Sequence, residues 1–430
     1  MKKNKFIKST FILLIGGFFT KLLGMLIKMT MSRMLGSEGI GIYMLIMPTF
    51  SLFISIAQFG FPVAISKLVA EDNKNNKNLV FGIIPISLFI NIFIIILLMF
   101  TSKVLSNNLL HEPRSYYVLL SIGLVLPFIS ISSIIRGYFF GKERMWPHVI
   151  SNLTEDIVRL ISIIIGIPIF LSKGVEFAVA FVVISNIVSE LTSILILFLF
   201  IPKNFKLEKK DILPNKKNVK EIMKISVPTT FGRLIGNIGY FFEPIILTTF
   251  LLKSGYDNNF IVNEYGVLSG YIIPLILLPS FFTMAISQAL IPVVSNSYAN
   301  NKKEIVKRKI IQAISFSLLI GIPITILFEV FPEYFLRLIY NTNQGISYLR
   351  ILAPICILQY IQAPLASSLQ AMGKAKDAMM SSVIGVIIRT TLLIIGCNIK
   401  IGMWGLVIAT SINIIFVTIH QIKKVRKYVF

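Results

Sequence analysis

The sequence predicts an all-α polytopic membrane protein, with about twelve transmembrane helices in two six-helix repeats that face a central cavity. Hydrophobic residues make up 55% of the 430 residues and charged residues only 14%, whereas a soluble domain carries about 25% charged residues. Apolar runs long enough to cross a bilayer follow one another along most of the chain. The two halves also share a motif, in which Lys21-Leu-Leu-Gly corresponds to Arg233-Leu-Ile-Gly.

The twelve predicted helices are the apolar runs of about 20 residues or more. They occupy residues 6–31, 40–68, 79–101, 116–139, 147–171, 174–201, 219–250, 264–297, 306–331, 347–371, 377–397 and 401–422. The first run follows a basic N-terminus but contains Lys21 and lacks a small-residue cleavage site. It is therefore predicted to be a retained helix rather than a signal peptide.

Prolines and glycines within the helices predict kinks and hinges. Proline removes a backbone hydrogen bond, and membrane helices tolerate it where neighbouring groups satisfy the freed carbonyl. The second and eighth helices contain most of these prolines. The predicted hinge residues are Gly24, Pro48, Pro62, Gly236, Pro274 and Pro292.

The distribution of lysine and arginine predicts the orientation. These residues concentrate in alternate segments between the apolar runs, beginning with the N-terminal Met1-Lys2-Lys3-Asn4-Lys5. Cytoplasmic segments of membrane proteins carry this excess. We therefore expect a multi-pass protein of the plasma membrane with both termini in the cytoplasm.

A basic polar segment near the midpoint divides the chain into three predicted parts. These are an N-terminal six-helix bundle (1–201), a cytoplasmic linker (202–218) and a C-terminal six-helix bundle (219–430). The linker fits either a segment lying along anionic headgroups or a solvated loop. An even number of helices per half gives both halves the same orientation, as in transporters built from parallel repeats.

Basic residues inside the apolar runs are the candidate ligand-binding residues, because a cation at the bilayer centre costs about 2.5–3.5 kcal/mol on insertion scales. The candidates for binding an anionic headgroup are Lys21, Lys28, Arg233, Arg389 and Arg159. Lys21 and Lys28 lie two turns apart on nearly the same face of one helix. The glycines of this stripe fit either a cavity lining or close helix packing.

Acidic residues within the runs predict counter-charges or an ion-coupling site. The candidates are Glu243, Glu190, Glu155 and Asp156. Glu155 precedes Arg159 by four residues, which favours an ion pair on one helix, so Arg159 fits structural pairing and cavity lining equally well. Arg389 has no acid three or four residues away on its own helix and could be neutralised by Glu190 or Glu243.

The excess of cations predicts a cavity for an anion, and phosphate or pyrophosphate is the common anion large enough to need several of them. The +23 net charge does not indicate nucleic acid, because the basic residues lie in short loops between apolar runs. Two cysteines and three scattered histidines offer no metal-ligand spacing. We therefore expect no metal, no cofactor and no enzymatic activity.

Three segments, 18–48, 134–160 and 265–299, resemble the family of stage V sporulation protein B and the polysaccharide-unit flippases. The middle segment contains the RGY–glycine–proline–glutamate–VR signature of that family. The larger superfamily also contains lipid II flippases and multidrug and toxin extruders. The resemblance implies that the first helix, with Lys21 and Lys28, meets a pyrophosphate.

The resemblance implies a flippase that moves undecaprenyl-pyrophosphate-linked oligosaccharides across the cytoplasmic membrane by alternating access. Such precursors serve the cell wall, the spore cortex or polysaccharides, so cell-wall synthesis enzymes are the expected partners. The alternative is a cation-coupled multidrug exporter of the same fold, in which Glu243 and the other buried acids bind sodium or protons. A membrane enzyme would need carboxylates or histidines clustered near one surface, and the outer loops offer only scattered ones.

Overall fold

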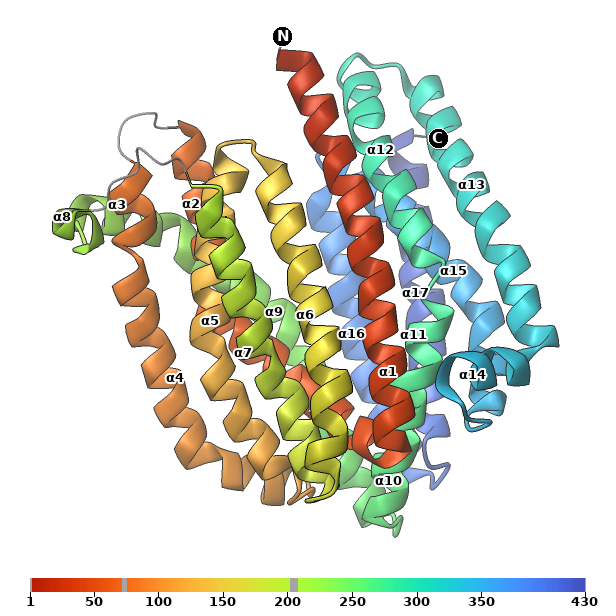
Figure 1. Ribbon diagram of the computed structural model, residues 1–430. Coiled ribbons are helices and arrows are strands. Elements are labelled where there is room, and N and C mark those ends of the chain that lie inside the picture. Colours follow the sequence, from red (N-terminus) through yellow and green to blue (C-terminus); the bar gives the residue numbers. More distant parts are fainter. Residues whose placement is uncertain (1, 72–75, 202–207, 430) are drawn as a thin grey trace. The chain divides into compact units, whose positions relative to one another are not determined.

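The computed structural model describes residues 2–71, 76–201 and 208–429, and the regular structure in these ranges is helical (Figure 1). The chain divides into two compact units, Met1–Ile245 and Ile246–Phe430. The helices of the first unit are α1 (Lys2–Gln58), α2 (Phe61–Glu71), α3 (Asn76–Phe81), α4 (Ile84–Val104), the π-helix η1 (Leu105–Leu109), α5 (Ser115–Gly141), α6 (Met145–Leu171), α7 (Val175–Leu199), α8 (Lys209–Ile212) and most of α9 (Lys216–Lys253).

The second unit continues from the end of α9. Its elements are α10 (Asn258–Gly266), the π-helix η2 (Val267–Ile272), α11 (Ile273–Ile276), α12 (Ser280–Ala299), α13 (Lys303–Val330), α14 (Pro332–Tyr340), α15 (Ile346–Ala371), α16 (Ala375–Asn398) and α17 (Trp404–Val429). The predicted division at residues 202–218 remains a prediction. The first part of α9 groups with the first unit, because its described contacts lie there.

The described helices confirm an all-α polytopic membrane protein. In the described ranges nine helices are long and apolar enough to cross a bilayer, or ten if the bent pair α10–α11 and α12 is one span. One of the nine, Ile15–Glu71, contains most of the first predicted span and all of the second. Helix α6 is not among the nine, and its central turns carry Glu155, Asp156 and Arg159. The count of twelve therefore stays a prediction.

The lipid-facing character of these helices is clearest on α4. Its aromatic side chains Phe89, Phe93 and Phe100 are 63–79% exposed. Exposed aromatic and aliphatic side chains of this kind suit hydrocarbon rather than water. Their exposure supports the membrane assignment.

The first long helix bends where a glycine permits it. Gly36 in α1 has φ 68° and ψ −174°, a conformation that only glycine adopts readily. The helix then continues through Pro48 and ends at Phe59 and Gly60, which both have positive φ. The predicted second helix, 40–68, is thus interrupted at Phe59–Gly60 rather than at Pro48, and Pro62 lies in the first turn of α2.

A buried asparagine satisfies the backbone at this interruption. Asn91 of α4 is fully buried, and its Nδ2 donates to the carbonyl of Ala57 at 3.4 Å, to that of Ser87 at 2.7 Å and to Ser130 Oγ at 3.1 Å. A free carbonyl within the bilayer costs several kcal/mol. Asn91 therefore stabilises the end of α1.

Two glycines bring α5 against α2. A Cβ on Gly137 would lie 2.7 Å from the carbonyl oxygen of Pro62, and one on Gly141 would lie 2.6 Å from that of Ser66. The spacing of these glycines is the small-xxx-small pattern that lets membrane helices approach closely. These two helices also form a hydrophobic core with α3 and α7.

The predicted eighth helix is bent in the second unit. Its two parts, Asn258–Ile276 and Ser280–Ala299, meet at 51°, shortly after Pro274. The hydroxyl of Tyr360 on α15 donates to the carbonyl of Ile276 at 2.6 Å. The Tyr360 ring fits because the facing residue on α13 is Gly321, where a Cβ would lie 2.4 Å from the ring. Hinge motion at this bend stays a prediction.

Polar contacts join segments that the sequence places on the same side of the membrane. On the predicted outer side of the first unit, Arg114 binds Glu112 and Glu38. Its hydrogen bonds to Glu112, and then those to Glu38, raise the pKa of the Arg114 guanidinium. On the predicted inner side, Asn78 binds the carbonyl of Leu213 at 2.9 Å. The contacts agree with the predicted alternation of connecting segments between the two sides of the membrane. Which side is cytoplasmic stays a prediction.

Candidate functional site

The cations of the first helix lie on an exposed face of α1. The side chains of Lys21 and Lys28 are both exposed. Lys28 interacts electrostatically with Lys21 and with Arg159 of α6. α1 and α6 pack closely, since a Cβ on Gly16 would lie 2.4 Å from the side chain of Val149. Three of the predicted cations therefore interact within the first unit, and we call them the cation cluster: Lys21, Lys28 and Arg159.

The glycines beside these lysines adjoin open space among the described residues of the first unit. A Cβ added to Gly17 or to Gly24 would meet no atom within 4 Å, whereas one on Gly16 would collide with α6. The same holds for Gly232 and Gly236 beside Arg233. The open space beside these glycines is compatible with a cavity lining, and the choice between cavity lining and close helix packing stays a prediction.

Arg233 lies within the first unit, beside the second section of α1. Its Nη1 donates to Gln58 Oε1 at 3.2 Å. One turn further along α9, Asn237 Nδ2 donates to Ser55 Oγ at 2.8 Å. The polar stripe of α9 therefore runs along residues 55–58, just before the interruption at Phe59 and Gly60.

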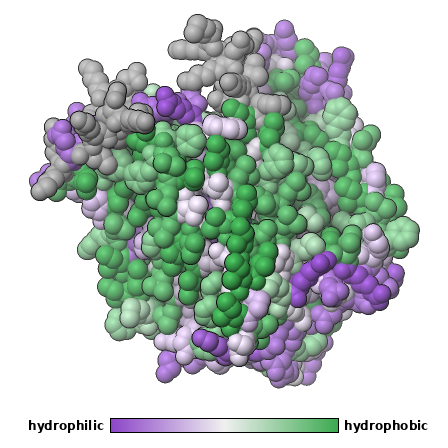
Figure 2. Space-filling view, viewed as in Figure 1, coloured by the Kyte–Doolittle hydropathy of each residue, from purple (hydrophilic) through white to green (hydrophobic). Residues whose placement is uncertain are grey.

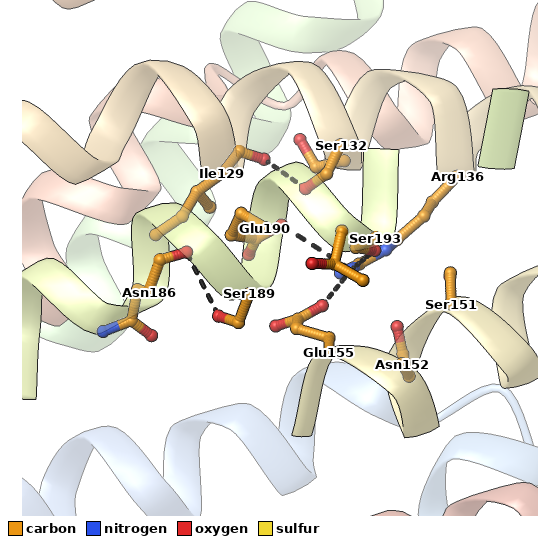
Figure 3. Close-up of polar contacts among 12 residues, drawn as sticks. Ile129, Ser132, Arg136, Ser151, Asn152, Glu155, Asn186, Ser189, Glu190 and Ser193 are labelled. Atoms are coloured by element: carbon orange, nitrogen blue, oxygen red, sulfur yellow. Dashed lines mark hydrogen bonds and ion pairs between the residues drawn. The ribbon is translucent and has the colours of Figure 1, made fainter. Parts of the chain in front are cut away.

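A second, buried network lies between α5, α6 and α7 (Figure 3). Arg136 of α5 forms an ion pair with Glu155 of α6 and donates to Ser193 Oγ of α7 at 2.6 Å. Glu190 of α7 lies 3.7 Å from the same guanidinium. The side chains of Arg136, Glu155 and Glu190 are 18%, 16% and 7% exposed. We call these three residues the arginine–glutamate network.

Sequence reasoning did not name Arg136 among the candidate site residues. The signal was present, because the residue belongs to the RGY motif and falls inside the predicted helix 116–139. Its place in α5 changes the pairing on α6. Glu155 contacts Arg136, and Arg159 forms no ion pair among the residues that the structure describes. The i,i+4 pair between Glu155 and Arg159 is therefore not formed.

On α6, two polar atoms of charged side chains lack hydrogen-bond partners in the described part of the chain. They are Asp156 Oδ2 and Arg159 Nε, and both atoms are buried. Asp156 interacts electrostatically with Glu155, Arg159 and Arg136. It therefore lies between the cation cluster and the arginine–glutamate network.

The remaining predicted residues lie elsewhere. Glu243 is buried on α9 near the end of the first unit. Arg389 lies on α16 of the second unit, where it is half-buried. One turn earlier Gly385 meets Asn413 and Val417 of α17. The roles of Glu243 and Arg389 stay predictions.

The two groups of residues differ in what they can do. Exposed lysines beside open space can bind an anion, whereas the positive charge of Arg136 is offset by Glu155 and Glu190 within the arginine–glutamate network. Within the described ranges, no group of three or more histidine, cysteine, aspartate or glutamate side chains is placed to hold a metal ion. The arrangement suits binding and transport of an anionic group.

Comparison with known proteins gives consistent matches. Residues 6–298 match the family model described as polysaccharide biosynthesis protein, and residues 269–395 match the model described as MatE. Stage V sporulation protein B of Bacillus subtilis (strain 168) is 36% identical, over 99% of this chain and 85% of the relative. Lipid II flippase MurJ of the same organism is 25% identical, over 90% of this chain and 77% of the relative.

A solved structure has the same fold. The inward-facing conformation of a multidrug resistance MATE family transporter of the MOP superfamily superimposes with a TM-score of 0.78. The alignment covers 95% of this chain and 94% of that one, at 16% identity. The likeness therefore concerns the fold alone.

Proposed function

Because the chain belongs to the polysaccharide biosynthesis protein family, we propose that it is a flippase for lipid-linked oligosaccharides. It moves an undecaprenyl-pyrophosphate-linked oligosaccharide across the plasma membrane by alternating access. The observation that carries this proposal is the cation cluster, whose lysines are exposed beside open space within an apolar helix. The protein is then a transporter rather than an enzyme, and both termini lie in the cytoplasm.

The charge of the cluster favours a pyrophosphate over a cation. Lys21, Lys28 and Arg159 lie near one another. Of the acids on α6 and α7 beside them, Glu155 and Glu190 pair with Arg136, whereas Asp156 forms no ion pair with a described residue. Lysines provide compact charges for phosphate oxygens, and arginine adds a planar fork. Arg233 of the same unit is proposed as a further headgroup ligand, and the role of Arg389 in the second unit stays a prediction.

The membrane potential supplies a driving force for such an anion. Moving about two negative charges out of a cell whose interior is negative by about 100 mV is favourable by roughly 4–5 kcal/mol. Export then needs no nucleotide, in agreement with a sequence that contains no Walker-type glycine loop. Glu155 and Glu190 act as counter-charges for Arg136 in this account.

The names of two relatives suggest the substrate class and setting. One is a sporulation protein and the other a lipid II flippase. We propose a cell-wall, spore-cortex or polysaccharide precursor as the cargo, with cell-wall synthesis enzymes as partners that make or use it.

A cation-coupled multidrug exporter is the second candidate. The MATE-like fold is compatible with it, and Asp156 has a buried oxygen without a hydrogen-bond partner among the described residues. Buried Glu243 is a second candidate for ion coupling. The exposed lysines oppose this function, because they repel a cationic drug.

Transport by reconstituted protein tests the flippase. Proteoliposomes would carry a fluorescent undecaprenyl-pyrophosphate oligosaccharide, and an imposed potassium diffusion potential would drive the anion outward. We expect potential-dependent flipping that falls about tenfold or more in Lys21→Ala/Lys28→Ala, given roughly 1.5–3 kcal/mol for a hydrogen bond to a charged group.

The matched control removes two exposed lysines outside the stripe, with Lys103→Ala/Lys173→Ala. This control should flip the lipid at the wild-type rate. Dye efflux driven by a sodium or proton gradient, without flipping of the lipid, would instead establish the exporter.

A further inference from the structure

The short helix α14 has an unusual exposed face. Pro332, Leu336 and Ile339 are buried, whereas Tyr334 and Leu338 are 61% and 51% exposed. Figure 2 shows hydrophilic surface over α14 that adjoins the apolar surface of the neighbouring helices. A helix with both kinds of surface at the end of membrane spans is suited to the headgroup region.

Several contacts hold α14 and the following loop in place. The ring of Tyr340 stacks on Tyr271 of η2, with centroids 5.0 Å apart. Arg337 Nε donates to Asn343 Oδ1 at 2.6 Å. Gly345 has φ 85°, and a Cβ there would lie 2.7 Å from a side chain of η2. The surface around α14 is therefore preformed and does not require a bound ligand to order it.

A cavity of about 560 Å³ opens between α14 and the start of α15. Its lining residues are Val330, Phe331, Pro332, Glu333, Tyr334, Arg337, Leu338 and Arg350. Arg350 forms no hydrogen bond or ion pair within the described part of the chain, and neither does Glu333. Two arginines thus face one cavity with their charges unneutralised by an ion pair.

We propose that this cavity binds the phosphate group of a membrane lipid. The guanidinium groups of Arg337 and Arg350 match phosphate geometry, and the hydroxyl of Tyr334 is a further donor. Val330, Phe331 and Leu338 are each more than half exposed at its edge. These apolar side chains would make no favourable contact with free phosphate, but they can contact the first carbons of a lipid chain.

Two sources can supply this chemistry, a phospholipid of the membrane or the phosphate of an isoprenoid lipid. The inference goes beyond the proposed function, because binding at α14 requires no transport. Glu333 lines the same cavity and opposes an anion there. Removing its charge should therefore strengthen binding of the anionic lipid, the opposite of the effect expected from removing an arginine.

Native mass spectrometry of the full chain in detergent tests the proposal. The probes are undecaprenyl phosphate, phosphatidylglycerol and phosphatidylcholine, each added at the same concentration. Arg350→Gln should lower occupancy by the bound anionic lipid about tenfold, the loss of one charge-assisted contact. Glu333→Gln should raise it several-fold.

The matched control is Arg308→Gln, which removes an exposed arginine at the opposite end of α13. The proposal is supported if the protein prefers undecaprenyl phosphate or phosphatidylglycerol and if this preference is lost in Arg350→Gln but kept in the control. The preferred lipid then identifies the source of the bound phosphate group. The proposal would be overturned if phosphatidylcholine bound as well as the anionic lipids, if lipid occupancy were unchanged in Arg350→Gln, or if occupancy fell equally in Arg350→Gln and Arg308→Gln. Because flipping is not measured, failure here leaves the proposed function untouched.

Discussion

Replacing Arg136 by glutamine should destabilise the first unit far more than replacing Arg159. Arg136→Gln removes the partner of Glu155 and Glu190, whose side chains are 16% and 7% exposed. Breaking a buried pair by removing one member costs about 3–5 kcal/mol, because the remaining charge is uncompensated. For a unit of this size such a loss lowers the Tm by on the order of 10 °C.

The assay is thermal unfolding of purified protein in detergent, with Arg159→Gln as the control. Arg159 forms no ion pair among the described residues, so its variant should lose about 1 kcal/mol or less. Combining Arg136→Met with Glu155→Gln and Glu190→Gln should recover most of the stability, because the network is then neutral throughout. If Arg159→Gln costs as much as Arg136→Gln, then Glu155 pairs along α6 and the described network is wrong.

Three further changes test the packing and the polar contacts. Gly137→Leu should overpack against α2 and cost about 1–3 kcal/mol of stability, measured as a lower Tm. Gly24→Ala should leave the Tm unchanged, and equal losses in the two variants would refute the open space beside Gly24. Tyr360→Phe leaves the carbonyl at the bend of the eighth helix unpaired and should cost about 1–3 kcal/mol, with faster hydrogen exchange at the bend and nowhere else. Arg114→Gln should speed exchange around buried Glu112, and unchanged protection there would argue against the outer-side ion pairs.

Composition and apolar run length were enough to predict the fold class, because only helices and closed barrels satisfy the backbone within lipid. The range 116–139 differs from α5 (Ser115–Gly141) by two residues at most. The second helix was harder to predict. Proline predicted kinks at Pro48 and Pro62, which stay predictions, whereas the break at Phe59 and Gly60 depends on α9, whose Ser226 carbonyl leaves no room for a side chain at Gly60.

The candidate site was partly predictable for a similar reason. Lys21 and Lys28 share a face by helical periodicity alone, and their exposure agrees with that pattern. The partner of Glu155 was not predictable from spacing, because the competing arginine comes from another helix, 19 residues earlier in the chain. Periodicity along one helix identifies an i,i+4 neighbour, but it cannot tell whether an acid pairs with that neighbour or with a residue of another helix.

The most direct test of the central claim is the affinity of the purified protein for undecaprenyl pyrophosphate, measured beside a cationic dye. The wild type should bind the lipid pyrophosphate and not the dye, and Lys21→Ala/Lys28→Ala should bind the lipid about tenfold more weakly or worse. Binding of the dye, with lipid binding absent or indifferent to the two lysines, would contradict the anionic-headgroup account and favour an exporter built around Glu243.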